Sequence, residues 1–295
     1  MAGRGEAAGQ IWVRAMPGLF VFLWSTGFIA AKYGMDYAGP FTLLGLRFLI
    51  VVVLMTALAW AMRAPWPPRA QWAPIALTGL FVHAGYLGGV FGALNLGVEA
   101  GIIALIAGLQ PVLTGALAGP LLGERVSRRQ WAGLALGLAG VILVVRTKLA
   151  LGLGTPIGMV FAIVCMLSIT TGTLAQKKFC AAMDLRTGSV IQFAASALVI
   201  VPIAIWLEGM VITPSWTLVG SLVWLCLVLS IGAVTLMFIL IRNGAAAEVV
   251  SLFFLVPPTT AILGWLTFSE KLDLISLLGM AMVVAAVAMV TWKRK

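Results

Sequence analysis

A histidine and a tyrosine within one apolar stretch are the side chains best suited to bind a polar solute. His83 is the only histidine in the chain, and Tyr86 follows it by three residues. In a helix this spacing places both side chains on nearly the same face. A titratable group is costly to bury in an apolar segment and is therefore a candidate for function. The alternative is a packing histidine hydrogen-bonded to a neighbouring helix, and we favour the binding role.

Two further side chains could complete such a site. Gln110 directly precedes Pro111 and offers both a donor and an acceptor. It could bind a substrate amide or carboxylate, or equally tie one helix to another. Trp24 lies in the middle of another apolar stretch, beside Ser25 and Thr26, where its ring could line a cavity or simply pack. An aromatic wall can hold apolar groups and can attract an ammonium group.

Arg47 is the one permanent cation well inside an apolar stretch. It could pair with a substrate carboxylate, or it could support the structure by bonding to carbonyl groups of a neighbouring helix. We favour the structural role. No second histidine and no cluster of cysteines or carboxylates accompanies His83, so neither a metal site nor a cofactor is expected. Nucleophile, zinc-protease and nucleotide-loop motifs are absent from the sequence, which argues against an enzyme.

These side chains belong to a chain whose composition indicates a membrane protein. Hydrophobic residues make up 62% of it, charged residues 9%, and the mean hydropathy is +1.12. A soluble core cannot bury that much apolar surface. Charged and Pro/Gly-rich breaks divide the chain into segments of about 20 residues, the length that crosses a bilayer. We expect ten such helices, at 12–34, 39–62, 72–95, 99–122, 128–146, 155–177, 187–207, 216–240, 245–267 and 273–292.

The ten segments form two copies of one unit at a constant offset of 146 residues. Gly123-Glu124-Arg125 aligns with Ser269-Glu270-Lys271, and Pro111 aligns with Pro257. Five helices per copy is an odd number, so the second copy crosses the membrane in the opposite direction. We therefore predict an all-α polytopic membrane protein with two inverted repeats, 1–148 and 149–295. Repeats of this kind are typical of transporters.

Matching positions in the two repeats are candidates for moving parts. Pro111 and Pro257 each remove a backbone hydrogen bond deep inside a helix, and could act as hinges or be purely architectural. Glu124 and Glu270 occupy equivalent loops, where they could form ion pairs at a gate or remain solvated. His83, Tyr86 and Trp24 differ: the second repeat has Leu229, Gly232 and Thr170 at those positions.

Basic residues indicate the orientation in the membrane. Most of the nineteen Lys and Arg residues fall on one side if both termini are cytoplasmic, as the positive-inside rule requires. The loop after Glu124 contains three arginines, whereas the loop after Glu270 contains one lysine. Topology and contact with anionic membrane lipids thus explain the net charge of +10, and no nucleic-acid partner is expected.

Three features resemble the EamA repeat of the drug/metabolite transporter superfamily. They are Gly-Glu-Arg followed by the Gly-rich segment from Trp131 to Gly140, the second copy of this pattern around Gly279, and Leu46-Arg47-Phe48. Within that superfamily the chain is most similar to bacterial amino-acid exporters of the YddG type. The resemblance implies a multi-pass protein of the bacterial inner membrane. In that fold the first four helices of each repeat surround a substrate path, the fifth lies at the periphery, and small metabolites are exported by alternating access.

From these observations we expect an exporter of small metabolites, with amino acids favoured, that acts as a monomer or weak homodimer. No Asp or Glu lies at the centre of an expected helix, and proton-driven carriers generally need a buried titratable group. We therefore expect facilitated transport, with substrate bound among His83, Tyr86, Gln110 and Trp24. The alternatives are a proton-coupled exporter of drugs or nucleoside-type metabolites, and a membrane scaffold that transports nothing.

Overall fold

The structure, a computed structural model, describes residues 2–98, 100–149, 154–268 and 273–291. In these residues every regular element is a helix, apart from one isolated antiparallel bridge between Ala38 and Ile212. Ten helical stretches among them are long and apolar enough to cross a membrane, in the positions predicted from the sequence. The chain is therefore an all-α polytopic membrane protein.

The spans of the first repeat are built from nine helical elements. The first two spans are α1 (Ala2–Met35), of which Ala15–Met35 is the apolar part, and α2 (Pro40–Ala61). The third joins η1 (Arg69–Gln71), α3 (Trp72–Gly79), the π-helix η2 (Leu80–Gly85) and α4 (Tyr86–Asn95). The fourth joins α5 (Ala100–Ala107) and α6 (Gln110–Leu122), and the fifth is α7 (Arg128–Leu149).

The second repeat follows the same order. Its sixth and seventh spans are α8 (Pro156–Phe179) and α9 (Leu185–Glu208). The eighth joins α10 (Trp216–Val223), the π-helix η3 (Trp224–Ala233) and α11 (Val234–Asn243). The ninth joins α12 (Ala246–Ser251), η4 (Leu252–Leu255) and α13 (Val256–Phe268), and the tenth is α14 (Leu274–Thr291).

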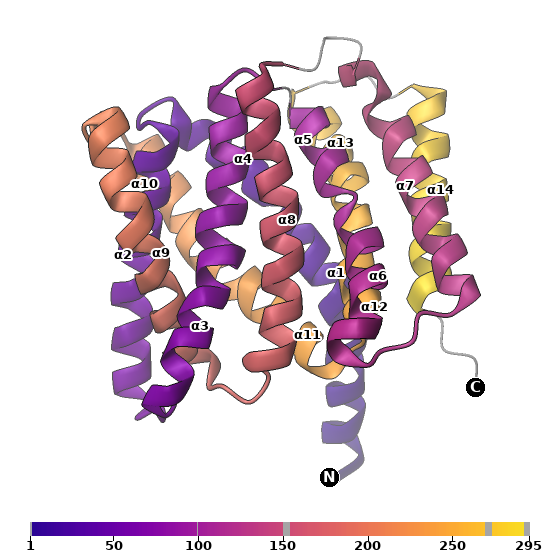
Figure 1. The fold of residues 1–295 in the computed structure, drawn as a ribbon, viewed down its shortest axis with the longest axis horizontal. Helices are drawn as coiled ribbons and strands as arrows, with labels where there is room; N and C mark the ends of the chain where they lie inside the picture. Colours follow the sequence, from indigo (N-terminus) through magenta and orange to yellow (C-terminus); the bar gives the residue numbers. More distant parts are fainter. Residues whose placement is uncertain (1, 99, 150–153, 269–272, 292–295) are drawn as a thin grey trace.

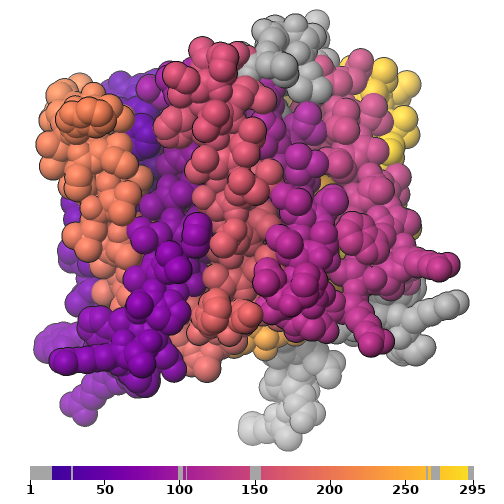
Figure 2. Space-filling view, viewed as in Figure 1, coloured from indigo at the N-terminus to yellow at the C-terminus, as the bar shows by residue number. Residues whose placement is uncertain are grey.

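Equivalent helices of the two repeats pack against one another. Helices α2 and α9 form a pair at one end of the molecule, and α7 and α14 form a pair at the other (Figure 1). Between these pairs α1 packs on η3 and α13, and its equivalent α8 packs on η2 and α6. Each contact of one repeat thus has a counterpart in the other, as an inverted duplication requires. Figure 2 shows the side chains of the spans closing over one lateral side of this arrangement.

Glycine allows α7 and α14 to pack closely. A Cβ atom added at Gly140 would lie 2.7 Å from the carbonyl oxygen of Gly279, and one added at Gly279 would lie 2.7 Å from that of Gly140. The two backbones therefore touch, and larger residues would separate the helices. This confirms that the fifth helix of each repeat lies at the edge of the fold.

Helices α7 and α14 both begin with a side-chain cap. The side chain of Gln130 accepts a hydrogen bond from Ser127 N, and Gln130 N donates to Ser127 Oγ, which together form a capping box at the start of α7. At the matching position Ser276 N donates to Asp273 Oδ1 at 2.7 Å. The hydrogen bonds from Ser276, and then the pairing with Arg146, lower the pKa of Asp273.

Candidate functional site

The fourth and ninth spans are interrupted at matching positions. The fourth span breaks between Ala107 and Gln110, and Pro111 lies in the first turn of α6. In the ninth span a 3₁₀ turn, η4, separates α12 from α13, in which Pro257 is the second residue. Proline cannot donate to the preceding turn, so the regular helix restarts there. The predicted breaks are confirmed, and their role as hinges stays a prediction.

The third and eighth spans each contain a π-helical stretch, which the sequence did not predict. At the repeat offset, η2 corresponds to residues 226–231, which lie within η3. A π-helix makes i→i+5 hydrogen bonds, is uncommon, and is frequent at functional sites. Composition in these segments resembles that of the flanking α-helices, so a single sequence offers no signal for them.

Four aromatic rings from both repeats form a cluster where α1, α4 and η4 meet. The rings of Trp24 and Tyr86 stack with their centroids 6.2 Å apart. Phe253 meets Trp24 edge-on at 5.2 Å and Phe20 edge-on at 5.3 Å, while Phe20 lies tilted against Trp24 at 5.3 Å. We call Phe20, Trp24, Tyr86 and Phe253 the aromatic cluster. Two of the residues predicted to bind substrate are thus in contact, and Phe20 and Phe253 join them.

His83 makes its ring contacts elsewhere. Its ring stacks on Phe193 of α9 at 4.0 Å and meets Phe48 of α2 edge-on at 6.2 Å. A π-helix turns through a smaller angle per residue than an α-helix, so His83 and Tyr86 do not share a face as the sequence suggested. His83 Nε2 and Gln192 Oε1 are buried without a hydrogen-bond partner. Gln192 Nε2 donates to Gln176 Oε1 at 2.8 Å.

Gln110 connects the fourth and sixth spans. It is buried, and its Nε2 donates to Thr173 Oγ1 at 3.3 Å. This is the helix-to-helix contact that the sequence left open as one alternative. A role of Gln110 in binding substrate stays a prediction.

Arg47 reaches from α2 to the two π-helices. Its Nε donates to Ser230 Oγ of η3 at 2.8 Å, and the thiol of Cys226 donates to its backbone carbonyl. Arg47 also lies close enough to His83 and Tyr86 to interact with them electrostatically. The cation therefore lies between the third and eighth spans, buried within the protein.

One face of the molecule is closed by links between the repeats. We call the face where α1 begins and α14 ends the terminal face (Figure 1). Here Glu124 pairs with Lys177 and accepts a hydrogen bond from Ala246 N at 2.8 Å. Lys177 also donates to Gly244 O. The loop after α6, the end of α8 and the start of α12 are thus held together.

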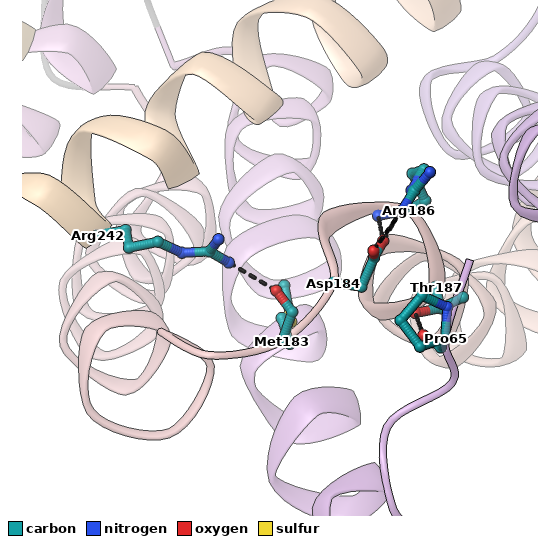
Figure 3. A network of polar contacts seen from close by, with 6 residues as sticks. All are labelled: Pro65, Met183, Asp184, Arg186, Thr187 and Arg242. Atoms are coloured by element: carbon teal, nitrogen blue, oxygen red, sulfur yellow. Dashed lines mark hydrogen bonds and ion pairs between the residues drawn. The ribbon is translucent and has the colours of Figure 1, made fainter. Parts of the chain in front are cut away.

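Neighbouring loops reinforce this closure (Figure 3). Arg242 of α11 donates to Met183 O at 2.6 Å, and Thr187 Oγ1 donates to Pro65 O at 2.8 Å. Asp184 caps α9 and pairs with Arg186, and these hydrogen bonds lower the pKa of Asp184. Its carboxylate is therefore charged at neutral pH, and its capping contribution is lost only as the pH falls through that lowered pKa.

The opposite face differs in sequence at one position of this link. Ala31 stands where the second repeat has Lys177. Glu270, the predicted equivalent of Glu124, lies outside the described residues. Near this face Glu208 of α9 accepts hydrogen bonds from Phe41 N at 2.9 Å and Thr42 N at 2.7 Å. It thereby satisfies exposed amides at the start of α2.

A lateral hollow lies between the first and eighth spans. It encloses about 340 Å³ and is lined by Thr26, Ile29, Ala30, Ser221 and Trp224, among others. Trp224 Nε1 donates to Thr26 Oγ1 at 3.0 Å across it. This hollow is outside the site that the sequence predicted.

Ten spans in two inverted repeats, with interrupted helices at matching positions, define a transporter architecture. The EamA-like transporter family matches residues 17–146 and again residues 156–292, so the chain belongs to this family. The predicted repeat boundary between 148 and 149 stays a prediction.

Similar proteins support the same class. The chain is 26% identical over 269 residues to the uncharacterized inner membrane transporter YedA of Escherichia coli K12, covering 91% of this chain and 87% of YedA. It is 27% identical over 275 residues to a probable amino-acid metabolite efflux pump of the same organism, covering 90% of each chain. A solved crystal structure superimposes with a TM-score of 0.78 at 23% identity, covering 94% of this chain and 96% of the other. That structural likeness shows the fold.

Proposed function

We propose that this transporter exports amino acids or closely related small metabolites across the bacterial inner membrane, by alternating access and without proton coupling. The aromatic cluster is the observation on which the proposal rests. Its four rings come from the first, third and ninth spans, beside the break in the ninth span. When the repeats move apart, such rings offer apolar surface for a side chain and negative ring faces for an ammonium group.

The two repeats supply the moving parts. Breaks in the fourth and ninth spans and π-helices in the third and eighth place weak points at equivalent depths of both repeats. The links at the terminal face close one end of the path. The positive-inside rule predicts that both termini lie in the cytoplasm. In this proposal the terminal face is therefore the cytoplasmic entrance of the exporter. The name of one similar protein, a probable amino-acid metabolite efflux pump, agrees with the substrate class.

The absence of proton coupling is argued from the titratable side chains of the spans. No carboxylate lies at the centre of a predicted span, and proton-driven carriers generally need a buried titratable group. His83 is the only histidine of the chain, and its buried ring stacks on Phe193.

Counterflow in proteoliposomes tests the function directly. Vesicles loaded with an unlabelled amino acid should take up the labelled one transiently, and saturably, only when the protein is present. Imposing a pH gradient should not make the vesicles concentrate substrate above equilibrium. Accumulation that depends on the pH gradient contradicts the facilitator and supports proton coupling, whereas no counterflow with any amino acid contradicts the substrate class.

A further inference from the structure

Arg47 is a buried cation without a carboxylate partner in the described part of the chain. The ion pairs there are Arg146 with Asp273, Lys177 with Glu124, and Arg186 with Asp184. The hydrogen bond from Arg47 goes to Ser230, a neutral hydroxyl. A guanidinium stays charged, and burying a charge without a counter-ion is costly. Its position therefore suits the binding of an anion.

The depth of Arg47 excludes simple contact with the membrane surface. It is the eighth residue of α2, which places it about 10 Å from the start of the helix at 1.5 Å per residue. Its exposed fraction is 6%, so the side chain does not extend to the lipid surface. It points instead into the protein, towards Ser230 of η3.

Symmetry shows that packing at this position does not require a cation. Phe193 is the equivalent of Arg47 in the second repeat, and it packs on His83 of η2. Each residue thus reaches from the second helix of its own repeat to the π-helix of the other. A phenylalanine serves the structure at one of these positions, so the charge at the other is free for a different role.

The surroundings of Arg47 suit one end of a zwitterion. Helix α2, which carries Arg47, packs against α4, which begins with Tyr86, and the Tyr86 ring stacks on Trp24 of the aromatic cluster. A cation and an aromatic surface are therefore neighbours. His83 is also near Arg47. The unpartnered oxygen of Gln192 can accept a hydrogen bond from its ring N–H. We assign no substrate contact to His83 here.

We propose that Arg47 binds the carboxylate of the transported solute, while the aromatic cluster holds the ammonium group and side chain. This proposal rests on the proposed function and narrows it to carboxylate-bearing solutes. A guanidinium matches a carboxylate with two parallel hydrogen bonds, and an uncharged amide cannot replace that pairing.

Transport of matched acids and amides tests the proposal. Wild-type protein in proteoliposomes should prefer phenylalanine to phenylalaninamide by about tenfold or more, since both share the ring and the ammonium group. Arg47→Gln should abolish this preference. Ser230→Ala removes the hydrogen-bond partner but keeps the guanidinium, so its preference should remain. An Arg47→Gln variant that folds and still prefers the acid overturns the proposal.

A second variant keeps the test valid if Arg47→Gln does not fold. Ser230→Asp places a carboxylate beside Arg47 and should compete with substrate, so transport of phenylalanine should fall at least about tenfold while the amide is spared. Unchanged preference in this variant overturns the proposal.

A further acid and amide pair, lactate and lactamide, separates the two proposals. Preference for lactate together with no transport of any amino acid supports Arg47 as the carboxylate site and contradicts the amino-acid function. Equal transport of acids and amides by the wild type overturns the Arg47 site and leaves the exporter function standing. Transport of no carboxylate at all contradicts both.

Discussion

Aromatic residues far apart in sequence meet inside this transporter. Trp24 and Tyr86 belong to the first repeat and Phe253 to the second, so the aromatic cluster joins the two halves. Its rings lie in edge and stacked arrangements that favour aromatic contact. In the proposed mechanism, movement of one repeat against the other would change these contacts and so link binding to conformation.

Replacing Trp24 tests the cluster at the level of one side chain. Trp24→Ala should raise the concentration of amino acid needed for half-maximal counterflow by about fivefold, because the substrate loses an aromatic contact worth about 1 kcal/mol. Trp24→Phe should retain most of the affinity. Trp206, which is 84% exposed at the end of α9, is the matched control, and Trp206→Ala should leave transport unchanged. Equal affinity of the Trp24→Ala variant and the wild type removes Trp24 from the site.

Helix interruptions lie at equivalent positions of the two repeats. Each repeat has one broken span and one span with a π-helix, and the two lie beside each other in sequence. Backbone groups freed at a break are satisfied by neighbouring helices in membranes, so the breaks are tolerated without loss of the fold.

Restoring regular helix at the prolines tests whether the breaks are hinges. Pro111→Ala should slow counterflow several-fold with little change in half-saturation, because it stiffens the fourth span without touching the aromatic cluster. Pro257→Ala should have a smaller effect, since Pro258 remains beside it. Pro202 lies inside the uninterrupted helix α9, and Pro202→Ala should not slow transport. Normal rates in the Pro111→Ala variant show that the break is architectural.

Links between the two repeats at one face act at the scale of the whole molecule. The terminal face is joined by Glu124, Lys177 and the start of α12, whereas Ala31 occupies the position equivalent to Lys177 near the other face. The half-buried pair connects the two repeats and so opposes their separation at this end. Its contribution is expected to be modest, on the order of 1 kcal/mol.

Breaking this pair should shift the molecule towards opening at the terminal face. Glu124→Gln should increase the labelling rate of a cysteine introduced near Ala246 several-fold, because about 1 kcal/mol corresponds to roughly a fivefold change in population. The native cysteines Cys165, Cys180 and Cys226 are buried and give a low background. Exchanging the charges with Glu124→Lys and Lys177→Glu together should slow labelling only in part, because the ion pair returns but the hydrogen bonds to Ala246 N and Gly244 O do not. Unchanged labelling in the Glu124→Gln variant shows that the pair does not close this face.

Local sequence features determined the number of spans, the repeat, the caps and the breaks. Each of these features depends only on residues close to it in sequence. Examples are the length of the apolar segments, the prolines Pro111 and Pro257, and the capping pair Ser127 and Gln130. Such features can be recognised in one sequence because hydrophobic length and lost backbone hydrogen bonds depend on neighbouring residues alone.

Only the tertiary structure decided which side chains meet. Arg47 bonds to a residue 183 positions away and Gln110 to one 63 positions away. The sequence placed His83 beside Tyr86, but the π-helix turned His83 towards Phe193 instead. Contacts of this kind depend on how whole helices rotate and pack, and one added residue in a turn changes every orientation that follows. That is why the repeat was predictable and the surroundings of its polar side chains were not.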